Sequence, residues 1–205
     1  YERVTPGSEY VSSIRNMWRQ LAAVDEVSLK EALEFLGTIV TKKINVLNAP
    51  IEKELAKVLE NTYRNIILAA SHDFDILAEH MEADLWKIIE GIKVRPTHSN
   101  ILGPSLGVGG YCLPKDGLLA LYAARHFFGM DLDESLLILR SNVINDLKPL
   151  RAVQFAIEGL KVFGKDLAGR NVAIMGASYR PGVADARYSP SETLAMSQKS
   201  NELKA

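Results

Sequence analysis

The residues best suited to chemistry lie around the single cysteine, Cys112. The segment 107–116 reads Gly-Val-Gly-Gly-Tyr-Cys-Leu-Pro-Lys-Asp. Its glycines let backbone N–H groups approach a ligand without a Cβ in the way, and Pro114 is typical of the first turn of a helix. Cys112 is therefore expected just before a helix N-terminus, where the helix dipole, with Lys115 nearby, favours the thiolate. Asp116 follows four residues later, on the same face as the thiol.

A nucleophile, a flexible loop and a nearby carboxylate together predict covalent catalysis at Cys112. The alternative is a buried, inert cysteine, which the neighbouring glycines and the Pro-Lys-Asp sequence make the weaker explanation. Because the chain has one cysteine, it cannot form an intrachain disulfide. A lone thiol is typical of a reducing compartment, so a cytoplasmic location is expected.

Two other groups of residues are candidates for binding. Lys57 and Asn61 lie four residues apart in a helical pattern and can present a cation and an amide to one ligand, although a solvated helix face explains their spacing better. The segment 179–190 contains Arg180 and Arg187 and ends where a helix begins. That arrangement suits phosphate or nucleotide recognition as well as it suits a surface loop.

No metal site is expected, because the four histidines lack metal-ligand spacing and there is no second cysteine. The Gly-x-Gly at 107–109 does not predict a dinucleotide site, since it follows a loop rather than a strand. With 24 Lys and Arg against 25 Asp and Glu, the net charge of −1 argues against a nucleic-acid or anionic-membrane partner. No apolar stretch approaches the ~20 residues of a membrane-spanning helix.

Hydrophobic spacing predicts a mainly α fold. The longest helical pattern covers 51–80, which at 1.5 Å per residue gives a helix of roughly 45 Å. Because ordinary helices average only ~11–12 residues, this one indicates a spine or a dimer interface. Shorter helices are expected at 9–21, at 28–40 with Ser28 as its cap, at 84–92, after 114, at 135–159 and from 189; short strands are expected at 44–47 and 171–176, and an irregular segment at 95–110.

These motifs resemble those of the NAD-dependent nucleotide-sugar 6-dehydrogenases, which include the UDP-glucose, UDP-N-acetylhexosamine and GDP-mannose dehydrogenases. The cysteine segment is similar to the family's catalytic motif. Glu-Leu-Ala-Lys at 54–57 and Glu-Asn-Thr-Tyr at 60–63 are similar to its central-helix motif. Residues 1–7 resemble a stretch late in the N-terminal NAD domain, and 178–190 resemble the opening of the C-terminal UDP-binding domain.

The resemblance implies a reaction and a role for each site residue. The family oxidises the C6 alcohol of the sugar twice, to a carboxylate, using two NAD⁺. Cys112 would attack the aldehyde, and Lys57 would stabilise the oxyanion. Asn61 and Asp116 would position water and share proton transfer. Arg95 would reach a substrate bound by the partner subunit. Within one subunit the substrate would be held by Tyr179, by Arg180 and by the loop Gly103, Pro104, Ser105, Leu106, Gly107, Val108 and Gly109. NAD would be held by Lys115 and Arg187.

The same resemblance divides the chain into a remnant of the N-terminal NAD-binding domain (1–49), a central helical dimerisation and catalytic domain (50–163) and an incomplete C-terminal UDP-binding domain (164–205). The expected fold is mainly α, with a long central dimerisation helix at 51–80 and residual α/β pieces of flanking Rossmann-like domains. Because most of the Rossmann domain is absent, we expect the chain alone not to turn over.

Two details of the sequence bear on the substrate and on departures from the family. The first residues and the central-helix motif favour a UDP-N-acetylhexosamine, whereas the segment 111–116 looks more like the UDP-glucose branch. The Asn-Glu that the family usually places after its central helix is His72-Asp73 here. A non-catalytic helical dimerisation module is the alternative function.

Overall fold

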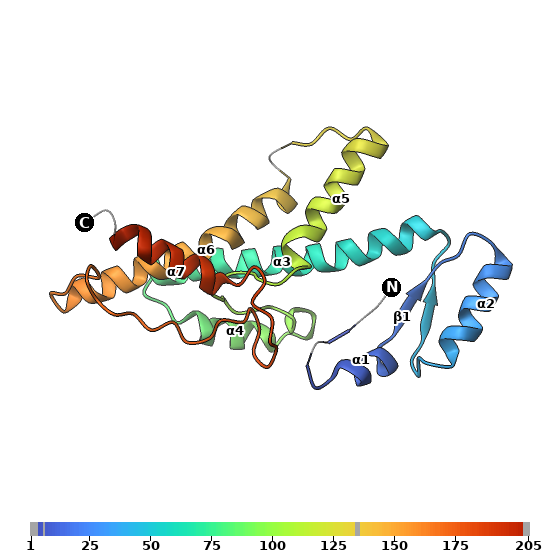
Figure 1. Ribbon diagram of the computed structural model, residues 1–205, viewed down its shortest axis with the longest axis horizontal. Coiled ribbons are helices and arrows are strands. Elements are labelled where there is room, and N and C mark those ends of the chain that lie inside the picture. The colour runs from blue at the N-terminus through green and yellow to red at the C-terminus, as the bar shows by residue number, and fades with distance from the viewer. Residues whose placement is uncertain (1–3, 6, 134–135, 203–205) are drawn as a thin grey trace. The chain divides into compact units, whose positions relative to one another are not determined.

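The structure, a computed structural model, describes residues 4–5, 7–133 and 136–202, without the side chains of 198–202. This part of the chain is mainly helical, with two short strands, as expected (Figure 1). It divides into two units, residues 1–60 and 61–205. The elements are α1 (Tyr10–Asn16), β1 (Arg19–Leu21), α2 (Glu26–Gly37), β2 (Ile44–Val46), α3 (Pro50–His80), α4 (Leu85–Lys93), the 3₁₀ helix η1 (Pro96–His98), α5 (Leu113–Phe128), α6 (Leu137–Val162) and α7 (Pro190–Glu202).

The first unit contains a small α/β piece. Strands β1 and β2 pair in parallel, with Arg19 opposite Ile44 and Leu21 opposite Val46. Helix α2 connects them, as parallel strands require a crossover. A strand–helix–strand unit of this kind fits the residual α/β piece expected near the N-terminus.

Two sequence expectations in this unit are wrong. The helix expected over 9–21 ends at Asn16, and Arg19–Leu21 form β1 instead. Pairing with β2 is a tertiary contact that overrides the local helical spacing. The cap of α2 is Asp25, not Ser28: the Asp25 carboxylate accepts from the Ser28 N–H at 2.7 Å. That hydrogen bond lowers the pKa of Asp25.

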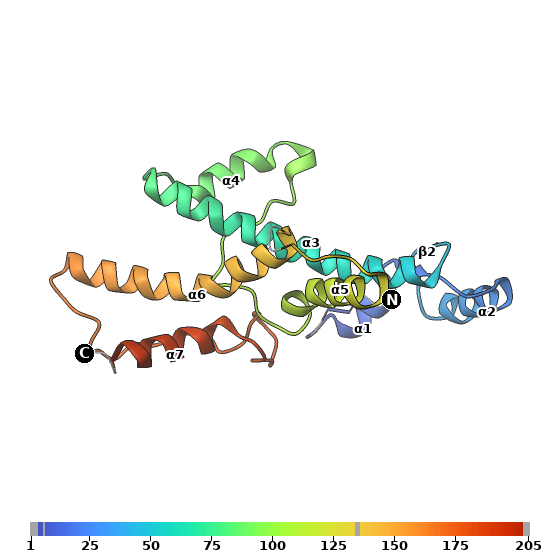
Figure 2. The same ribbon diagram turned by 90° about the horizontal axis from the view of Figure 1, so that it is seen from above.

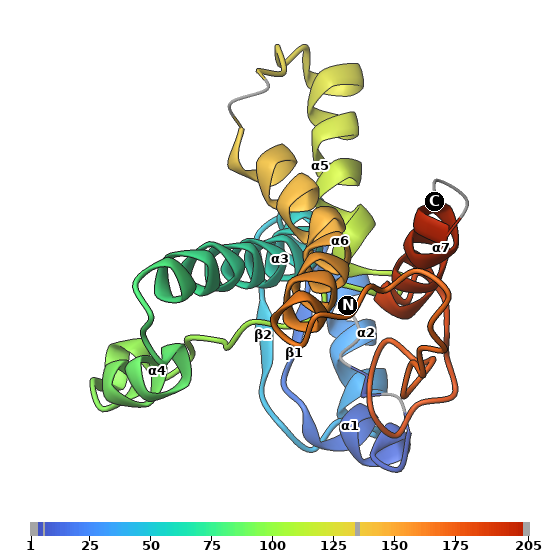
Figure 3. The ribbon, with the colours of Figure 1, turned by 90° about the vertical axis from the view of Figure 1, so that its left-hand side faces the viewer.

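In the second unit, the end of α3 turns into α4. Asp84 caps α4 by accepting from the backbone N–H groups of Trp86 and Lys87. The two helices enclose a small apolar cluster in which Ile89 is 1% exposed, and α4 lies beside the end of α3 in the ribbon (Figure 3). The other members of the cluster are Ala78 and Leu85, and the partly buried Ile101 packs against it.

Polar side chains join α3 to α6. The buried Asn145 donates to the Asn65 carboxamide oxygen at 2.8 Å, and Asn65 donates in turn to Asn142. Further along, buried Lys148 forms an ion pair with Asp75. Buried polar groups stabilise a packing only when they are paired, so this interface fixes one register of α6 on α3.

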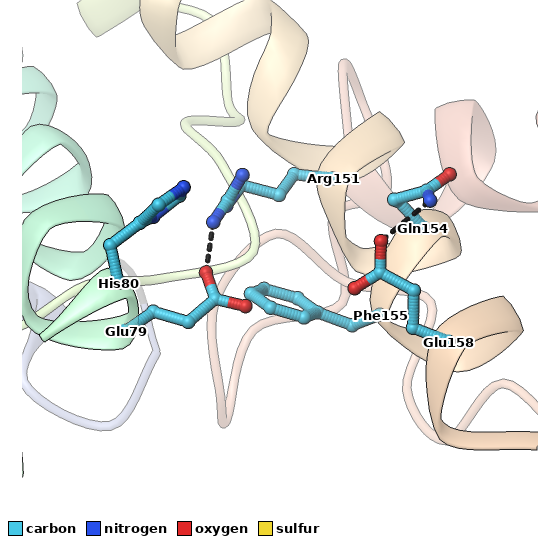
Figure 4. A pocket seen from close by; sticks show the side chains of 6 residues that line it. All are labelled: Glu79, His80, Arg151, Gln154, Phe155 and Glu158. Carbon is cyan, nitrogen blue, oxygen red and sulfur yellow. Dashed lines mark hydrogen bonds and ion pairs between the residues drawn. The ribbon is translucent and has the colours of Figure 1, made fainter. Parts of the chain in front are cut away.

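The ion pairs continue to the end of α3. Arg151 pairs with Glu79 beside a surface hollow of about 430 Å³, and its guanidinium carbon lies 4.9 Å from the centre of the Phe155 ring (Figure 4). Gln154 donates to Glu158 at 2.7 Å on the far side of the same hollow. Glu79 and Arg151 thus pair with each other, as do Gln154 and Glu158, and we assign the hollow no ligand.

The C-terminal part departs from expectation in one element. Helix α7 begins at Pro190, as the Ser-Pro sequence indicates, and packs beside α6 (Figure 2). Residues 171–176, expected to form a buried strand, have no strand structure, and Met175 is 96% exposed. A strand needs a partner for its backbone groups, and the described residues nearby offer none. No described helix is long and apolar enough to cross a membrane.

Candidate active site

Cys112 lies where the sequence places it, at the cap of α5. The helix begins at Leu113 with Pro114 in its first turn, and the N–H of Asp116 donates to the carbonyl of Cys112 at 3.0 Å. The thiol is exposed. An accessible sulfur at the positive end of a 16-residue helix has the surroundings of a nucleophile rather than of a packing residue.

Asp116 is a buried carboxylate, 4% exposed, bound at both oxygens. Asn61 of α3 donates to Oδ2 at 2.6 Å, and Lys115 Nζ lies 2.7 Å from Oδ1. The hydrogen bond to Asp116 raises the pKa of Lys115, because it favours the ammonium form. The structure therefore brings three of the sequence-predicted residues, Asn61, Lys115 and Asp116, into one connected group next to Cys112.

Gly117 explains why α3 and α5 approach closely enough for this group to form. A Cβ on Gly117 would lie 2.7 Å from Ile138 Cγ2 and 3.2 Å from Thr62 Oγ1, which is closer than side chains normally pack. Thr62 and Asn61 are neighbours on α3, as Gly117 and Asp116 are on α5. The absence of a side chain at 117 thus lets the helices come close enough for Asn61 to donate to Asp116.

The glycine loop, residues 103–109, packs against two helices, α4 and α6. Gly103 packs directly on the indole of Trp86. Gly107 has a positive φ of 143°, and a Cβ there would lie 3.2 Å from both the Asn145 carbonyl oxygen and the Pro149 ring. In a helix the Asn145 carbonyl would accept from the N–H of residue 149, but residue 149 is a proline and has no N–H, so this hydrogen bond is missing. The interior proline of α6 thereby forms part of the wall behind the loop.

The segment 179–190 packs on Gly109 and Gly110, just before Cys112, a contact that the sequence did not predict. The Gly110 N–H donates to the Arg187 carbonyl at 3.1 Å. A Cβ on Gly109 would lie 2.6 Å from the Tyr188 carbonyl oxygen and 2.7 Å from Tyr179 Cβ. Two candidate groups that are almost 70 residues apart along the chain thus form one site.

The ring of Tyr111 lies close to two cations in this site. Lys115 Nζ is 5.0 Å from the centre of the Tyr111 ring, and the Arg187 guanidinium carbon is 5.5 Å from it. Arg187 also binds Asp185 through Nε at 3.0 Å and Nη2 at 2.7 Å. This hydrogen bonding lowers the pKa of Asp185 to about 2. The two cations stay charged at neutral pH and flank an exposed aromatic face.

Replacing Gly109 by alanine should separate these two segments. The new Cβ would meet backbone oxygen as well as side-chain carbon, so the contact cannot be relieved by a rotamer change. We expect the Gly110 amide to exchange with deuterium at least ~10-fold faster, because its bond to Arg187 opens. Gly91→Ala is the control, since a Cβ there meets nothing within 4 Å. Equal exchange in both variants would show that the packing is not as described.

Comparison with known proteins connects this site to a family. Residues 52–143, which contain the α3 pair and the cysteine segment, match the central domain of the UDP-glucose/GDP-mannose dehydrogenase family. Residues 52–143 are the central domain of this family. The chain is 35% identical over 191 residues to a UDP-N-acetyl-D-mannosamine dehydrogenase of Methanocaldococcus jannaschii, covering 93% of this chain and 41% of that protein.

Solved structures of nucleotide-sugar dehydrogenases share the fold. A UDP-D-ManNAc dehydrogenase from Pyrococcus horikoshii has a TM-score of 0.85 at 29% identity, covering 97% of this chain and 45% of that one. An NDP-N-acetyl-D-galactosaminuronic acid dehydrogenase from Methanosarcina mazei has a TM-score of 0.84 at 26% identity, covering 97% and 43%. The chain therefore spans less than half the length of the relatives that it matches.

Not every residue that the dehydrogenase resemblance singles out lies in the connected group. Arg95 precedes η1 and is exposed, with no side-chain hydrogen bond or ion pair to the described residues. Arg180 is exposed next to Tyr179, whose ring lies against Gly110. Lys57 lies on α3 in the other structural unit, so its distance from Cys112 is not assigned. The roles given to these residues stay predictions.

The structure adds site residues that sequence reasoning missed. Asn142 donates to the Pro114 carbonyl at 3.0 Å, and so ties α6 to the first turn after Cys112. His72 lies inside α3, not after the central helix, and its Nε2 is 3.2 Å from Ser105 Oγ. The departure from the family's Asn-Glu pattern was the one sequence signal for His72, whereas nothing in the sequence pointed to Asn142. Among the described residues, no cluster of His, Cys, Asp and Glu suits a metal.

Proposed function

We propose that this chain is the central, cysteine-bearing part of an NAD-dependent UDP-sugar 6-dehydrogenase that acts on a UDP-N-acetylhexosamine. The observation that carries the proposal is Cys112, exposed at the start of α5, beside a buried Asp116 bound by Asn61 and Lys115. The names of the similar proteins support the substrate class, with UDP-N-acetyl-D-mannosamine as the preferred candidate.

The proposed reaction is a four-electron oxidation in two stages. Loss of hydride from C6 and of the hydroxyl proton converts the alcohol into an aldehyde. The Cys112 sulfur then attacks the aldehyde carbon and gives a thiohemiacetal. Loss of a second hydride from this carbon, together with the proton of its hydroxyl group, leaves a thioester. Water then cleaves the C–S bond, which releases the carboxylate and restores the thiol. NAD⁺ supplies the hydride acceptor in both stages.

Lys57, Asn61 and Asp116 would have separate tasks in this scheme. Lys57 would stabilise the negative oxygen of the tetrahedral species, and a fixed charge-stabilising donor of this kind lowers a barrier by about 3–4 kcal/mol. Asn61 and Asp116 would position the attacking water, with Asp116 accepting its proton. The bond from Asn61 holds the carboxylate toward α3, which supports a positioned base rather than a free surface group.

The loop and the cations suit anionic ligands. The segment 103–109 would wrap the sugar nucleotide together with Tyr179 and Arg180, as the resemblance implies. Arg95 from a second copy of the chain would also contact this substrate. Lys115 and Arg187 would hold NAD. Both converge on the Tyr111 ring next to the thiol, and a pair of cations on an aromatic face fits a phosphate-bearing cofactor.

The helix α3 supports a homodimer through 51–80. Within the second unit it exposes Tyr63, Phe74 and Leu77, with exposed fractions from 42% to 55%. Repeated apolar side chains on one helix are expected to be covered by another protein surface. The dimer, a cytoplasmic setting that keeps the thiol reduced, and the inactivity of these 205 residues alone are parts of the proposal. A non-catalytic dimerisation module would use the same face without the chemistry.

Protection of Cys112 from alkylation tests the proposal. We expect UDP-N-acetylmannosamine to slow modification by iodoacetamide, followed by intact mass, at least ~5-fold at saturation, because the ligand would cover the loop that precedes the thiol. UDP-glucose should protect less. The control variant carries Cys112→Ser and Ser8→Cys, which moves the single thiol to an exposed residue of the first unit. No protection by any UDP-sugar would favour the dimerisation module.

A further inference from the structure

Two adjacent buried residues of α3 hold the glycine loop. Ser71 donates to the Leu102 carbonyl at 2.6 Å, and His72 Nε2 lies 3.2 Å from Ser105 Oγ. Ser71 and His72 are each 1% exposed. Ser105 Oγ also donates to the Gly107 carbonyl at 3.0 Å. These bonds connect the core of α3 to the loop at points three residues apart.

The hydrogen bonds indicate which imidazole nitrogen carries the proton. Since Ser105 Oγ–H is donated to Gly107, its oxygen is left to accept from His72 Nε2–H. The Ser105 N–H also donates toward Nε2, at the longer distance of 3.4 Å, a bond that needs the proton on Nδ1 instead and would leave that Nδ1–H as a buried donor without a partner among the described residues. In the Nε2–H tautomer the buried Nδ1, which has no hydrogen-bond partner among the described residues, is a bare acceptor rather than an orphan donor.

The surroundings of His72 keep it neutral. Burial, the largest cause, and the nearby Lys148 cation together lower its pKa from 6.5 to about 4, against the opposing effect of Asp75. Lys148 comes from α6 and Asp75 from α3, where they form an ion pair. An uncharged imidazole with one N–H is a directional donor to a single acceptor.

We propose that His72 is a positioning residue, which, through Ser105, sets the path of residues 103–109 before substrate binds. On one side the loop is tied to α3 by Ser71 and His72. On the other, Gly107 rests on the Asn145 carbonyl and Pro149 of α6. Pre-ordering a binding loop raises affinity by removing the cost of ordering it. This inference rests on the proposed function, which gives the loop to the sugar nucleotide.

The loop itself provides the first test, without any ligand. In His72→Phe, which keeps a buried ring but loses the donor, amides of 105–107 should exchange at least ~10-fold faster, while those of α3 stay within about threefold. His72→Gln keeps an N–H donor near the same place and should restore slow exchange. His80→Phe is the control, since His80 lies on the same helix but bonds only its own helix carbonyl of Ile76. Unchanged exchange in His72→Phe would overturn the proposal.

A second pair of variants covers the case in which the buried Phe disrupts α3. Ser105→Ala removes the acceptor from the loop side and leaves His72 in place. It should speed loop exchange as His72→Phe does, and the double variant should add little more, because both changes break one interaction. Additive effects in the double variant would show that the two residues act separately.

The binding measurement separates this inference from the proposed function. The UDP-N-acetylmannosamine concentration that half-protects Cys112 should rise about 10-fold in His72→Phe and return to within about threefold in His72→Gln. If the sugar nucleotide protects neither wild type nor variants, the proposed function fails, while the exchange data still decide whether His72 orders the loop. If protection is identical in all three, His72 does not position a substrate loop.

Discussion

In the full dehydrogenase that we propose, replacing Cys112 by serine should lower the rate of NADH formation by roughly 10³-fold or more. At neutral pH a thiol supplies far more of its nucleophilic anion than a hydroxyl does, so the attack on the aldehyde slows. The ester that serine would form is also cleaved by water more slowly than a thioester. The expected loss falls on the second oxidation, because forming the aldehyde requires no nucleophile.

Two further variants are compared with Cys112→Ser. Lys57→Ala should cost roughly 10²–10³-fold, as removal of one oxyanion donor does, and it should leave the Cys112 thiol available for alkylation. Ser8→Cys, which adds a thiol in the first unit without touching the site, should leave the rate unchanged. Rates are measured from NADH absorbance with saturating UDP-sugar and NAD⁺. A Cys112→Ser enzyme that retains more than about a tenth of the wild-type rate would contradict covalent catalysis by this residue.

Acidification should destabilise the second unit through His72. The folded pKa of His72 is about 4, below the 6.5 of an unperturbed histidine, because burial and Lys148 oppose the charged form. Between these two pH values the unfolded chain binds the proton and the folded chain does not, so the free energy of unfolding falls as pH falls. This stabilisation is fully present above about pH 6.5, and the loss of it amounts to roughly 3 kcal/mol by the time the pH reaches 4.

Urea unfolding at pH 7, 5.5 and 4.5 measures this dependence. Other groups titrate in the same range, so the informative quantity is the difference between wild type and His72→Gln, which cannot protonate at this position. That difference should shift by roughly 2.4 kcal/mol between pH 7 and pH 4.5. His80→Gln, which changes an exposed histidine of the same helix, should follow wild type. Parallel pH profiles for wild type and His72→Gln would show that residue 72 is not buried in neutral form.

Where structure follows from neighbouring residues, the sequence was sufficient. The apolar spacing over 51–80 predicted α3 nearly to the residue, because a helix is built from contacts three and four positions apart. Pro114 placed Cys112 just outside a helix for the same reason. The type and order of the motifs were enough to recognise the dehydrogenase family, since each motif is a short local run.

Tertiary structure decided what depends on residues far apart in the chain. Residues 19–21 form a strand because they pair with residues 44–46. Residues 171–176 do not form one, because no described segment pairs with their backbone. The packing of 179–190 on Gly109 and the hold of His72 on Ser105 each join segments separated by more than 30 positions. Such contacts depend on how helices pack, and on where a missing Cβ lets them meet, which no local spacing specifies.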